Sequence, residues 1–368
     1  MQPKPQIVNL PVYQQGKPVE EVKRELGLDE VIKLASNENP YGASPKAKAA
    51  IEQELSQISM YPDGNAVELT EVLAGHLGVN RDQFVFGCGS DEVIALITRA
   101  FLLPGEENIM ADQTFSVYKS NADIEGAVSI EVPLVEGTHD LDGMLKAVNE
   151  RTKIIWICNP NNPTGTIVAH TDIVNFLDKV PEHVLVVLDE AYAEFVTDPS
   201  YPDSLSLLSK YPNLMILRTF SKIYGLASLR IGYGVGQPSV VRLINQVREP
   251  FNTSRLAQAA AKAALTDHEF IDACRTKNRS GVEYLTAEFD RLGLKYFPAH
   301  GNFILVNVKK SGREVFQSLL KLGIIIRAGF DKYPEYIRVS VGTPDENTKF
   351  IAALEKVLTV QEQPVTAE

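Results

Sequence analysis

Short, continuous apolar runs between residues 84 and 220 constrain the fold of this 368-residue chain more than any other feature. Most of them do not alternate apolar with polar residues, so both faces of each strand must be covered. Helical patterns such as residues 90–102 lie between them. This alternation predicts an α/β fold with a mainly parallel sheet. The predicted strands are FVFG (84–87), ENIMA (107–111), SIEVPLV (129–135), KIIWIC (153–158), HVLVVLDE (183–190) and LMILRTF (214–220).

The sequence pattern changes after residues 248–254. A long helical region is predicted over roughly 255–290, and strands then alternate with helices toward the C-terminus. This arrangement is typical of an α+β unit and predicts a second, smaller domain. We therefore expect a large domain over 41–250 and a small C-terminal domain over 251–368, with residues 1–40 adding to the small domain.

Charge and hydropathy exclude several classes of partner. The formal net charge of −11 and the pI near 5.2 argue against nucleic acid and anionic membranes. The first residues lack a basic region followed by an apolar stretch, and no run is long enough to span a bilayer. We expect a cytoplasmic protein that acts on small molecules.

The cysteines and histidines show no pattern of a metal site. Cys88, Cys158 and Cys274 are isolated thiols without CxxC spacing, and the six histidines show no HExxH motif. The chain has no GxxxxGKS or GxxxxGKT segment, and GYGVG at 232–236 lacks the GxGxxG spacing of a dinucleotide site. We expect a reduced, metal-free protein that is not a nucleotide enzyme.

Unusual polar residues follow four of the predicted strands. NPNNPTG (159–165) follows one strand, and DEAY (189–192) ends another. Lys222 and the GSDE segment (89–92) follow two more. Ligands of open α/β sheets bind at the carboxyl edge of the strands. The sequence therefore predicts one crevice surrounded by an asparagine, an aspartate, a tyrosine and a lysine.

Each of these motifs also has a purely structural interpretation. Asp189 could cap a helix, and the Asn-Pro and Pro-Thr-Gly sequences commonly form tight turns. A lone lysine such as Lys222 is more often solvated than catalytic. The combination favours chemistry, because a lysine in a desolvated site loses its proton more easily and attacks an aldehyde to form a Schiff base.

Eight motifs occur in a fixed order along the chain: SNENPYG, YPDG, GSDE, TFSVY, NPNNPTG, DEAY, TFSKIYGLASLRIGY and IRVSVG. With them the chain resembles the fold-type I, pyridoxal-phosphate-dependent aminotransferases, specifically the histidinol-phosphate aminotransferase family. The resemblance covers roughly residues 7–360 and implies pyridoxal 5′-phosphate as cofactor. It also implies a seven-stranded, mainly parallel sheet and a homodimer with shared active sites, to which residues 1–40 contribute.

The resemblance assigns five residues to the cofactor ring. Lys222 would attach the cofactor and move a proton between Cα and C4′, while Asp189 would pair with the protonated ring nitrogen. Asn162 and Tyr192 would hydrogen-bond the phenolic oxygen. Tyr118 would stack on the ring face. By pairing with the ring nitrogen, Asp189 would keep the ring protonated and able to accept an electron pair.

A second group of residues is assigned to the cofactor phosphate. Backbone N–H groups at the start of the helix after FVFG offer an anion site through unpaired donors and the helix dipole. The acidic side chains of that first turn oppose this, so basic and hydroxyl groups are needed nearby. The resemblance implies Ser90, Asp91, Thr219, Ser221 and Arg230 for this role, together with Tyr61 from the neighbouring subunit.

Two arginines and a tyrosine are assigned to the substrate. Arg338 would bind an α-carboxylate in bidentate fashion and Arg327 a distal anion, with Tyr41 lining the same pocket. The segment between the two arginines is short and aromatic, which departs from the family pattern and leaves the mode of distal-group recognition open. Ser228, where glycine is common, is a second departure that we expect to matter little.

Three functional hypotheses remain at this point. The first is interconversion of histidinol phosphate and 2-oxoglutarate with imidazole acetol phosphate and glutamate, a step of histidine biosynthesis. The second keeps the cofactor but uses phenylalanine or tyrosine with 2-oxoglutarate, alone or as a second activity. The third is a cofactor-free binding protein, against which the full set of cofactor residues counts. The sequence sets neither the preference between these substrates nor an assembly beyond a dimer.

Overall fold

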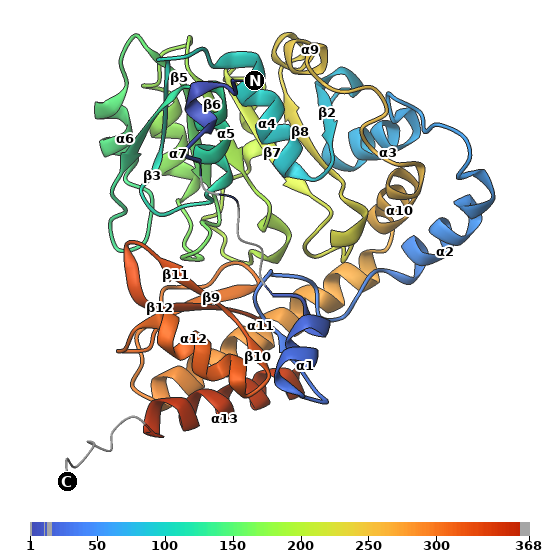
Figure 1. Ribbon diagram of the computed structural model, residues 1–368. Coiled ribbons are helices and arrows are strands. Elements are labelled where there is room, and N and C mark those ends of the chain that lie inside the picture. The colour runs from blue at the N-terminus through green and yellow to red at the C-terminus, as the bar shows by residue number, and fades with distance from the viewer. Residues whose placement is uncertain (1, 11, 13–16, 361–368) are drawn as a thin grey trace.

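A seven-stranded sheet forms the core of the large domain in this computed structural model, which describes residues 2–10, 12 and 17–360 (Figure 1). The strand order is β2-β8-β7-β6-β5-β3-β4, and β8 alone runs antiparallel to its neighbours. The predicted α/β fold with a mainly parallel sheet is confirmed. The strands are β2 (Phe84–Gly87), β3 (Glu107–Ala111), β4 (Val128–Val132), β5 (Thr152–Cys158), β6 (Leu185–Asp189), β7 (Leu214–Thr219) and β8 (Gly232–Gly236).

Strand β8 was not predicted, because its sequence GYGVG is rich in glycine, which is depleted in strands. The structure gives the reason for the glycines. A Cβ atom on Gly232 would lie 2.4 Å from the backbone nitrogen of Ser90, and one on Gly234 would lie 2.3 Å from Cε of Met215. The backbone of α4 therefore requires a residue without a side chain at Gly232, whereas the tip of the Met215 side chain occupies the space beside Gly234.

Helices cover both faces of this sheet, as the continuous apolar runs require. Along β5, Ile155 and Ile157 pack into one core cluster, whereas Ile154 and Trp156 pack into another on the opposite face. The helices of the large domain are α2 (Pro45–Glu54), α3 (Val67–Leu77), α4 (Ser90–Phe101), α5 (Val117–Glu125), α6 (Leu141–Ala147), α7 (His170–Leu177), α8 (Ser204–Leu207), α9 (Pro238–Gln246) and α10 (Arg255–Leu265).

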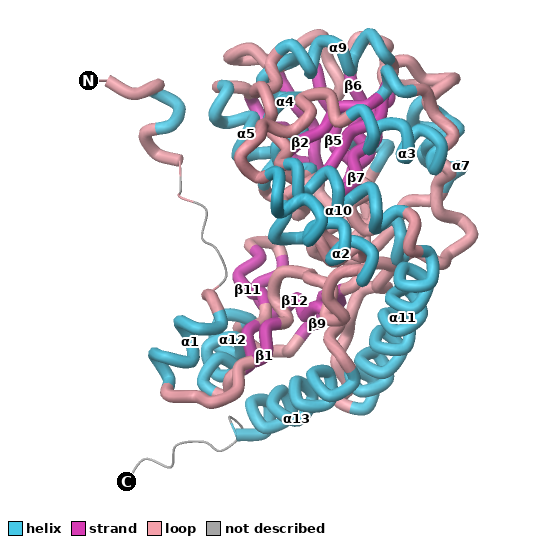
Figure 2. The backbone as a smooth tube through the Cα atoms, turned by 90° about the vertical axis from the view of Figure 1, so that its right-hand side faces the viewer, coloured by secondary structure: helices cyan, strands magenta, loops and turns pink. Residues whose placement is uncertain are grey.

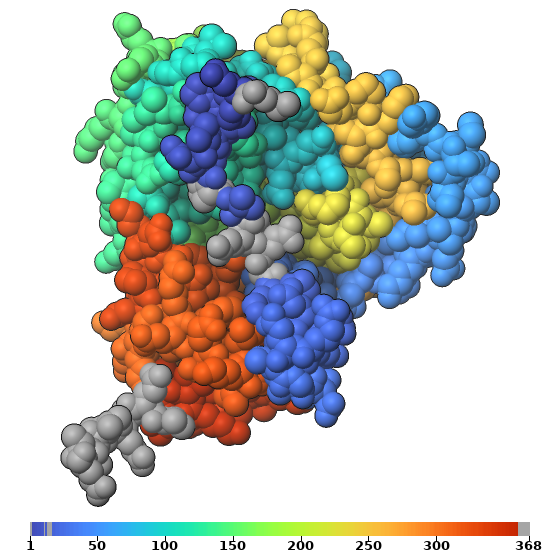
Figure 3. Space-filling view, viewed as in Figure 1, coloured from blue at the N-terminus to red at the C-terminus, as the bar shows by residue number. Residues whose placement is uncertain are grey.

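The small domain is built on a three-stranded antiparallel sheet with the order β11-β12-β9. A parallel pair, β1 with β10, joins the N-terminal region to this domain. Figure 3 shows the blue surface around α1 against the orange surface of the small domain. The elements are α1 (Val19–Leu26), β1 (Ile32–Lys33), β9 (Phe303–Asn307), α12 (Gly312–Lys321), β10 (Ile324–Ile325), β11 (Arg327–Phe330), β12 (Tyr333–Ser340) and α13 (Pro344–Val360).

The helical region expected over 255–290 is two helices, α10 and α11 (His268–Arg291). The alanines of α10 belong to the core of the large domain, and this helix lies along α2 (Figure 2). Helix α10 therefore packs with the large sheet, although it follows the domain boundary expected at residue 250.

Helix α11 joins the two domains. Ile271 and Cys274 near its start pack into the core of the large domain, whereas Leu285 and Phe289 near its end pack into the core of the small one. Among the described residues, no helix is both long enough and apolar enough to cross a membrane.

Candidate active site

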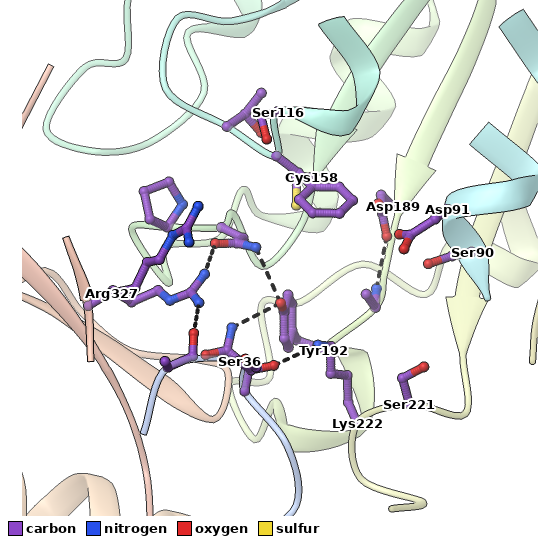
Figure 4. A pocket seen from close by; sticks show the side chains of 18 of the residues that line it. Ser36, Ser90, Asp91, Ser116, Cys158, Asp189, Tyr192, Ser221, Lys222 and Arg327 are labelled. Atoms are coloured by element: carbon purple, nitrogen blue, oxygen red, sulfur yellow. Dashed lines mark hydrogen bonds between the residues drawn. The ribbon is translucent and has the colours of Figure 1, made fainter. Parts of the chain in front are cut away.

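A cavity of about 530 Å³ lies at the carboxyl edge of the large sheet and is lined by residues of both domains. Figure 4 shows Ser90 and Ser221 on one side of it and Arg327 on the other, with Tyr192 and Lys222 between. The structure thus brings together the polar segments that follow β2, β5, β6 and β7. The predicted residues that line the cavity are Ser90, Asp91, Asn162, Asp189, Tyr192, Thr219, Ser221, Lys222, Arg230, Arg327 and Arg338.

Lys222 follows β7 in a tight turn. The turn needs Gly225, whose φ is +70° and whose Cβ would lie 2.0 Å from the carbonyl oxygen of Gly42. Nζ of Lys222 donates to the carbonyl oxygen of Ser36 at 3.3 Å. Burial, reinforced by the positive charge of Arg338, lowers the pKa of the Lys222 amine to about 8. A pKa near 8 leaves roughly a tenth of this amine neutral at pH 7, far more than for an ordinary lysine.

Asp189 ends β6 and is 2% exposed. Oδ2 accepts a hydrogen bond from the hydroxyl of Tyr118 at 2.6 Å, and Oδ1 accepts one from the backbone N–H of Ala191 at 3.1 Å. Burial raises the pKa of the Asp189 carboxyl to about 6, although both donors act in the opposite direction. A positive charge placed against this carboxyl group would strongly favour its ionised form.

The expectation that Tyr118 stacks on the cofactor ring is wrong in its geometry. Tyr118 is fully buried and does not line the cavity; its ring stacks on Trp156 with centroids 4.8 Å apart. Phe115, three residues earlier in the same TFSVY motif, lines the cavity instead. The start of α5 at Val117 decides which aromatic side chain faces the cavity, and the motif alone does not reveal that position.

A hydrogen-bonded chain links Tyr192 to its surroundings. The hydroxyl of Tyr192 accepts from Nδ2 of Asn37 at 3.1 Å and from Nδ2 of Asn162 at 3.4 Å. Burial raises the pKa of the Tyr192 phenol, so it remains a neutral donor. Asn37 was missed in the sequence, although it lies in the quoted SNENPYG motif, and its φ of +55° is unusual for a residue other than glycine.

The segment between Arg327 and Arg338 forms a β-hairpin of strands β11 and β12, joined by a short turn after Phe330. Arg338 is 8% exposed. Its Nη1 donates to Oδ1 of Asn162 at 2.5 Å and its Nη2 to the carbonyl oxygen of Ala35 at 2.6 Å. This arginine from the small domain therefore contacts the large domain directly. Its guanidinium reaches the same asparagine that donates to Tyr192.

A cluster of donors forms the opposite end of the cavity. Gly89, with φ of +82°, precedes the first residue of α4, and a Cβ on it would lie 2.5 Å from Nη2 of Arg230. Nη1 of Arg230 donates to Oγ of Ser221 at 3.3 Å, and Nη2 pairs with Oδ2 of Asp91 at 3.3 Å. The helix N-terminus, the guanidinium and the hydroxyl together suit an anion.

Besides Tyr118, two more of the predicted residues lie outside the cavity of this chain. Tyr41 was expected beside Arg327, but it lines a separate small cavity with Phe195 and Cys274, and this expectation is wrong for the chain as it stands. Its place is set by the turn after Asn39, whose Oδ1 accepts from the backbone N–H of Tyr41 at 3.0 Å. Tyr61 is 78% exposed and stacks on Phe251 with centroids 4.8 Å apart.

The fold and this site together are those of an aminotransferase, and comparison with known proteins gives the same class. The chain belongs to the aminotransferase class I and II family, whose model matches residues 29–354.

Particular relatives within that family narrow the comparison. The chain is 54% identical to a histidinol-phosphate aminotransferase of Brevibacillus brevis over 360 residues, which cover 98% of this chain and 99% of that protein. It is 53% identical to the enzyme of the same name from a Geobacillus species, over 97% and 98% of the two chains. A solved histidinol-phosphate aminotransferase from Sinorhizobium meliloti, in complex with pyridoxal-5′-phosphate, matches with a TM-score of 0.90 and 30% identity over 96% of each chain.

Proposed function

We propose that this chain is a pyridoxal-phosphate-dependent aminotransferase that acts on histidinol phosphate and 2-oxoglutarate, giving imidazole acetol phosphate and glutamate in histidine biosynthesis. One observation carries the proposal: a single cavity holds Lys222 and Asp189 between an anion site at Arg230 and a pair of arginines at the other end. A cofactor with one phosphate and a substrate with its own anionic group both find a place there.

The residues present fit pyridoxal phosphate. The space that a Cβ on Gly89 would fill lies against the Arg230 guanidinium, and the helix N-terminus beside it suits a phosphate. Asp189 is a buried acid whose carboxylate would pair with a protonated ring nitrogen, because an unpaired buried charge is costly. We propose that Ser90, Asp91, Thr219, Ser221 and Arg230 hold the phosphate and that Phe115 covers one ring face.

When bound, the cofactor supplies an aldehyde that condenses with amino groups and a ring that accepts an electron pair. Lys222 would form the covalent attachment, because its lowered pKa leaves part of the amine unprotonated. The same amine, in its free form, would be the base that accepts the proton from the substrate Cα. Tyr192, held by Asn37 and Asn162, would donate its hydroxyl proton to the phenolic oxygen of the cofactor.

The two arginines would read the substrate. Arg338 would bind the carboxylate of glutamate through a bidentate pair, replacing its present contacts with Asn162 and Ala35. Arg327, on the neighbouring strand, would bind the distal phosphate of histidinol phosphate or the side-chain carboxylate of glutamate. Both amino donors would then bind in one pocket, histidinol phosphate mainly through Arg327 and glutamate through both arginines.

The molecule also presents a surface suited to a second copy of the chain. Several large apolar side chains are exposed around Tyr61, and exposed apolar patches mark interaction sites. We propose a homodimer, located in the cytoplasm, in which Tyr61 reaches the cofactor phosphate of the partner subunit. The exposed side chains are Leu55 at 50%, Ile58 at 67%, Met60 at 62%, Tyr61 at 78% and Phe251 at 47%.

A survey of half-reactions tests the proposed function. The holoenzyme is mixed in turn with histidinol phosphate, glutamate, phenylalanine and tyrosine, and both the cofactor absorbance and the keto product are measured. We expect histidinol phosphate and glutamate to convert the cofactor to its amino form. Conversion by the aromatic amino acids but not by histidinol phosphate would replace this proposal with an aromatic aminotransferase, which Phe115 and Phe330 in the cavity wall would accommodate.

A further inference from the structure

Tyr118 contacts, from one buried position, both residues that would touch the cofactor ring. Its hydroxyl donates to Oδ2 of Asp189 at 2.6 Å. Its ring meets the edge of the Phe115 ring with centroids 5.6 Å apart and planes at 84°. Asp189 and Phe115 line the cavity, whereas Tyr118 lies fully buried behind them. A single side chain therefore supports the acid and the aromatic wall of the site together.

Trp156 in turn holds Tyr118. The two rings stack with centroids 4.8 Å apart and an interplanar angle of 7°, and both side chains are fully buried. Such packing leaves a large ring almost no freedom to reorient. The direction of the Tyr118 hydroxyl toward Asp189 is thus set by the core of the large domain. Trp156 is also the single tryptophan of the chain, so all tryptophan fluorescence comes from this position beside Tyr118.

The surroundings of Asp189 make this hydrogen bond important. Its β5 neighbour Cys158 is a neutral thiol, because burial raises its pKa to about 12, and its β7 neighbour Leu217 is apolar. Two further carboxylates, Asp91 and Glu190, favour protonation of Asp189. The Tyr118 hydroxyl and the Ala191 N–H oppose them by donating to the carboxylate oxygens.

We propose that Tyr118 is a positioning residue that holds Asp189 ionised and aligned toward the ring nitrogen of the cofactor. This inference rests on the proposed cofactor role of Asp189. Loss of the hydroxyl would leave the buried carboxylate with one fewer donor and make it bind a proton more readily. A protonated Asp189 no longer offers a negative charge to a protonated ring nitrogen.

A titration of Trp156 fluorescence in the full-length, cofactor-free chain tests the proposal directly. Between about pH 5 and pH 8 the wild-type chain should show a transition near pH 6, where Asp189 titrates. Tyr118→Phe keeps both ring contacts and removes only the hydroxyl, so its transition should move upward by about one pH unit or more. Asp189→Asn should show no transition.

Tyr211→Phe is the matched control. The Tyr211 hydroxyl donates to Oδ1 of Asp178 at the same distance of 2.6 Å, but Asp178 is half-exposed and does not line the cavity. This variant should titrate like the wild type. The proposal is overturned if Tyr118→Phe keeps the wild-type midpoint, if the transition survives in Asp189→Asn, or if the wild-type chain shows no transition.

A double-mutant cycle on the affinity for pyridoxal phosphate provides a second readout. At about pH 6.5 Tyr118→Phe should weaken binding roughly threefold or more, and the loss should shrink as the pH rises above the shifted midpoint. In an Asp189→Asn background the same substitution should have little effect, because a neutral amide has no charge to hold. An equal loss in both backgrounds would assign Tyr118 a general structural role.

Two complications have clear answers. If Tyr118→Phe does not fold, 3-fluorotyrosine can replace Tyr118 alone. Its phenol is a stronger donor, so the midpoint should shift downward. An unchanged midpoint would overturn the proposal. The fluorescence titration needs neither cofactor nor substrate. A shifted midpoint in a chain that fails to transaminate would therefore contradict the proposed function while leaving the positioning role in place.

Discussion

Arg327 and Arg338 face each other directly across the antiparallel strands β11 and β12, and both side chains line the cavity that holds Lys222. Two like charges opposite one another on neighbouring strands repel, so other charges must compensate them. In the proposed function the two arginines bind different anionic groups, so their roles should be separable by substrate choice.

Arg327→Gln should raise the KM for histidinol phosphate much more than the KM for phenylalanine, which has no distal anion. Loss of one charge-assisted contact costs about 1.5–3 kcal/mol, or roughly ten- to a hundredfold. Steady-state kinetics with both amino donors measures the difference. Arg313→Gln removes an arginine that lies beside Gly329 of β11 but outside the cavity, and it should leave both values unchanged. Equal losses for the two substrates would give Arg327 a structural role.

Asp189→Asn should stabilise the cofactor-free chain above pH 6 while it impairs catalysis. The pKa of Asp189 in the folded chain, about 6, exceeds its ordinary value of 3.8, so the folded chain binds this proton more tightly than the unfolded one. The ionised carboxylate thus destabilises the fold, and the penalty grows as the pH rises from about 4 to 6. We expect a gain of about 1–3 kcal/mol at neutral pH that vanishes near pH 4.

Chemical denaturation at several pH values measures that gain, and Asp178→Asn provides a control of opposite sign. Hydrogen bonds from Lys210 and Tyr211 lower the pKa of Asp178. Its contribution to stability is therefore present above the unfolded pKa and is lost as the pH falls through the folded one. Asp178→Asn should lose stability at neutral pH. A loss of stability in Asp189→Asn at neutral pH would contradict the argument for that residue.

Hybrid dimers should recover activity from two inactive chains. Lys222→Ala removes the amine that we propose attaches the cofactor and moves the proton, so it should abolish turnover without unfolding the chain. A Tyr61 variant should bind the cofactor weakly, because each subunit then lacks the tyrosine that its partner would supply to the cofactor phosphate. Mixing the two variants produces dimers with one intact site, and activity should reappear on mixing. Full activity of an isolated monomer, measured by sedimentation and assay together, would rule out shared sites.

Gly89→Ala should weaken binding of pyridoxal phosphate about tenfold or more, because the new Cβ would lie 2.5 Å from Nη2 of Arg230 and displace it from the anion site. Gly105→Ala is matched in backbone strain, with φ of +83° against +82°, but its Cβ would meet nothing within 4 Å. Both variants should lose stability, whereas only Gly89→Ala should lose affinity in an equilibrium titration. The same loss of affinity in both would point to a general effect of strain.

Sequence patterns located the strand ends well because continuous apolar runs are a strong signal of buried strands. Asp189 and Lys222 could be singled out from the sequence for this reason, since each stands where a continuous apolar run ends. The patterns failed where the answer depended on contacts between distant segments. β8 is a strand because Gly232 and Gly234 allow close packing, and α10 belongs to the large core because its alanines fit against α2.

The exchange of Tyr118 for Phe115 has a similar cause. Both are aromatic residues of one short motif, and the difference in their burial depends on the position at which α5 begins. Asn37 was overlooked because an asparagine in a turn-rich segment has many structural uses. Its hydrogen bond to Tyr192 arises only when the N-terminal segment crosses between the two domains.

Helix α11, whose 24 residues extend about 36 Å, is anchored at one end in each of the two cores. Dividing the chain anywhere within this helix would expose apolar residues of both cores to water. Neither domain is therefore a transferable module, and separately expressed halves should aggregate. The whole chain should instead melt in one cooperative transition. Recombination between relatives would tolerate crossover points in surface loops far better than any within this helix.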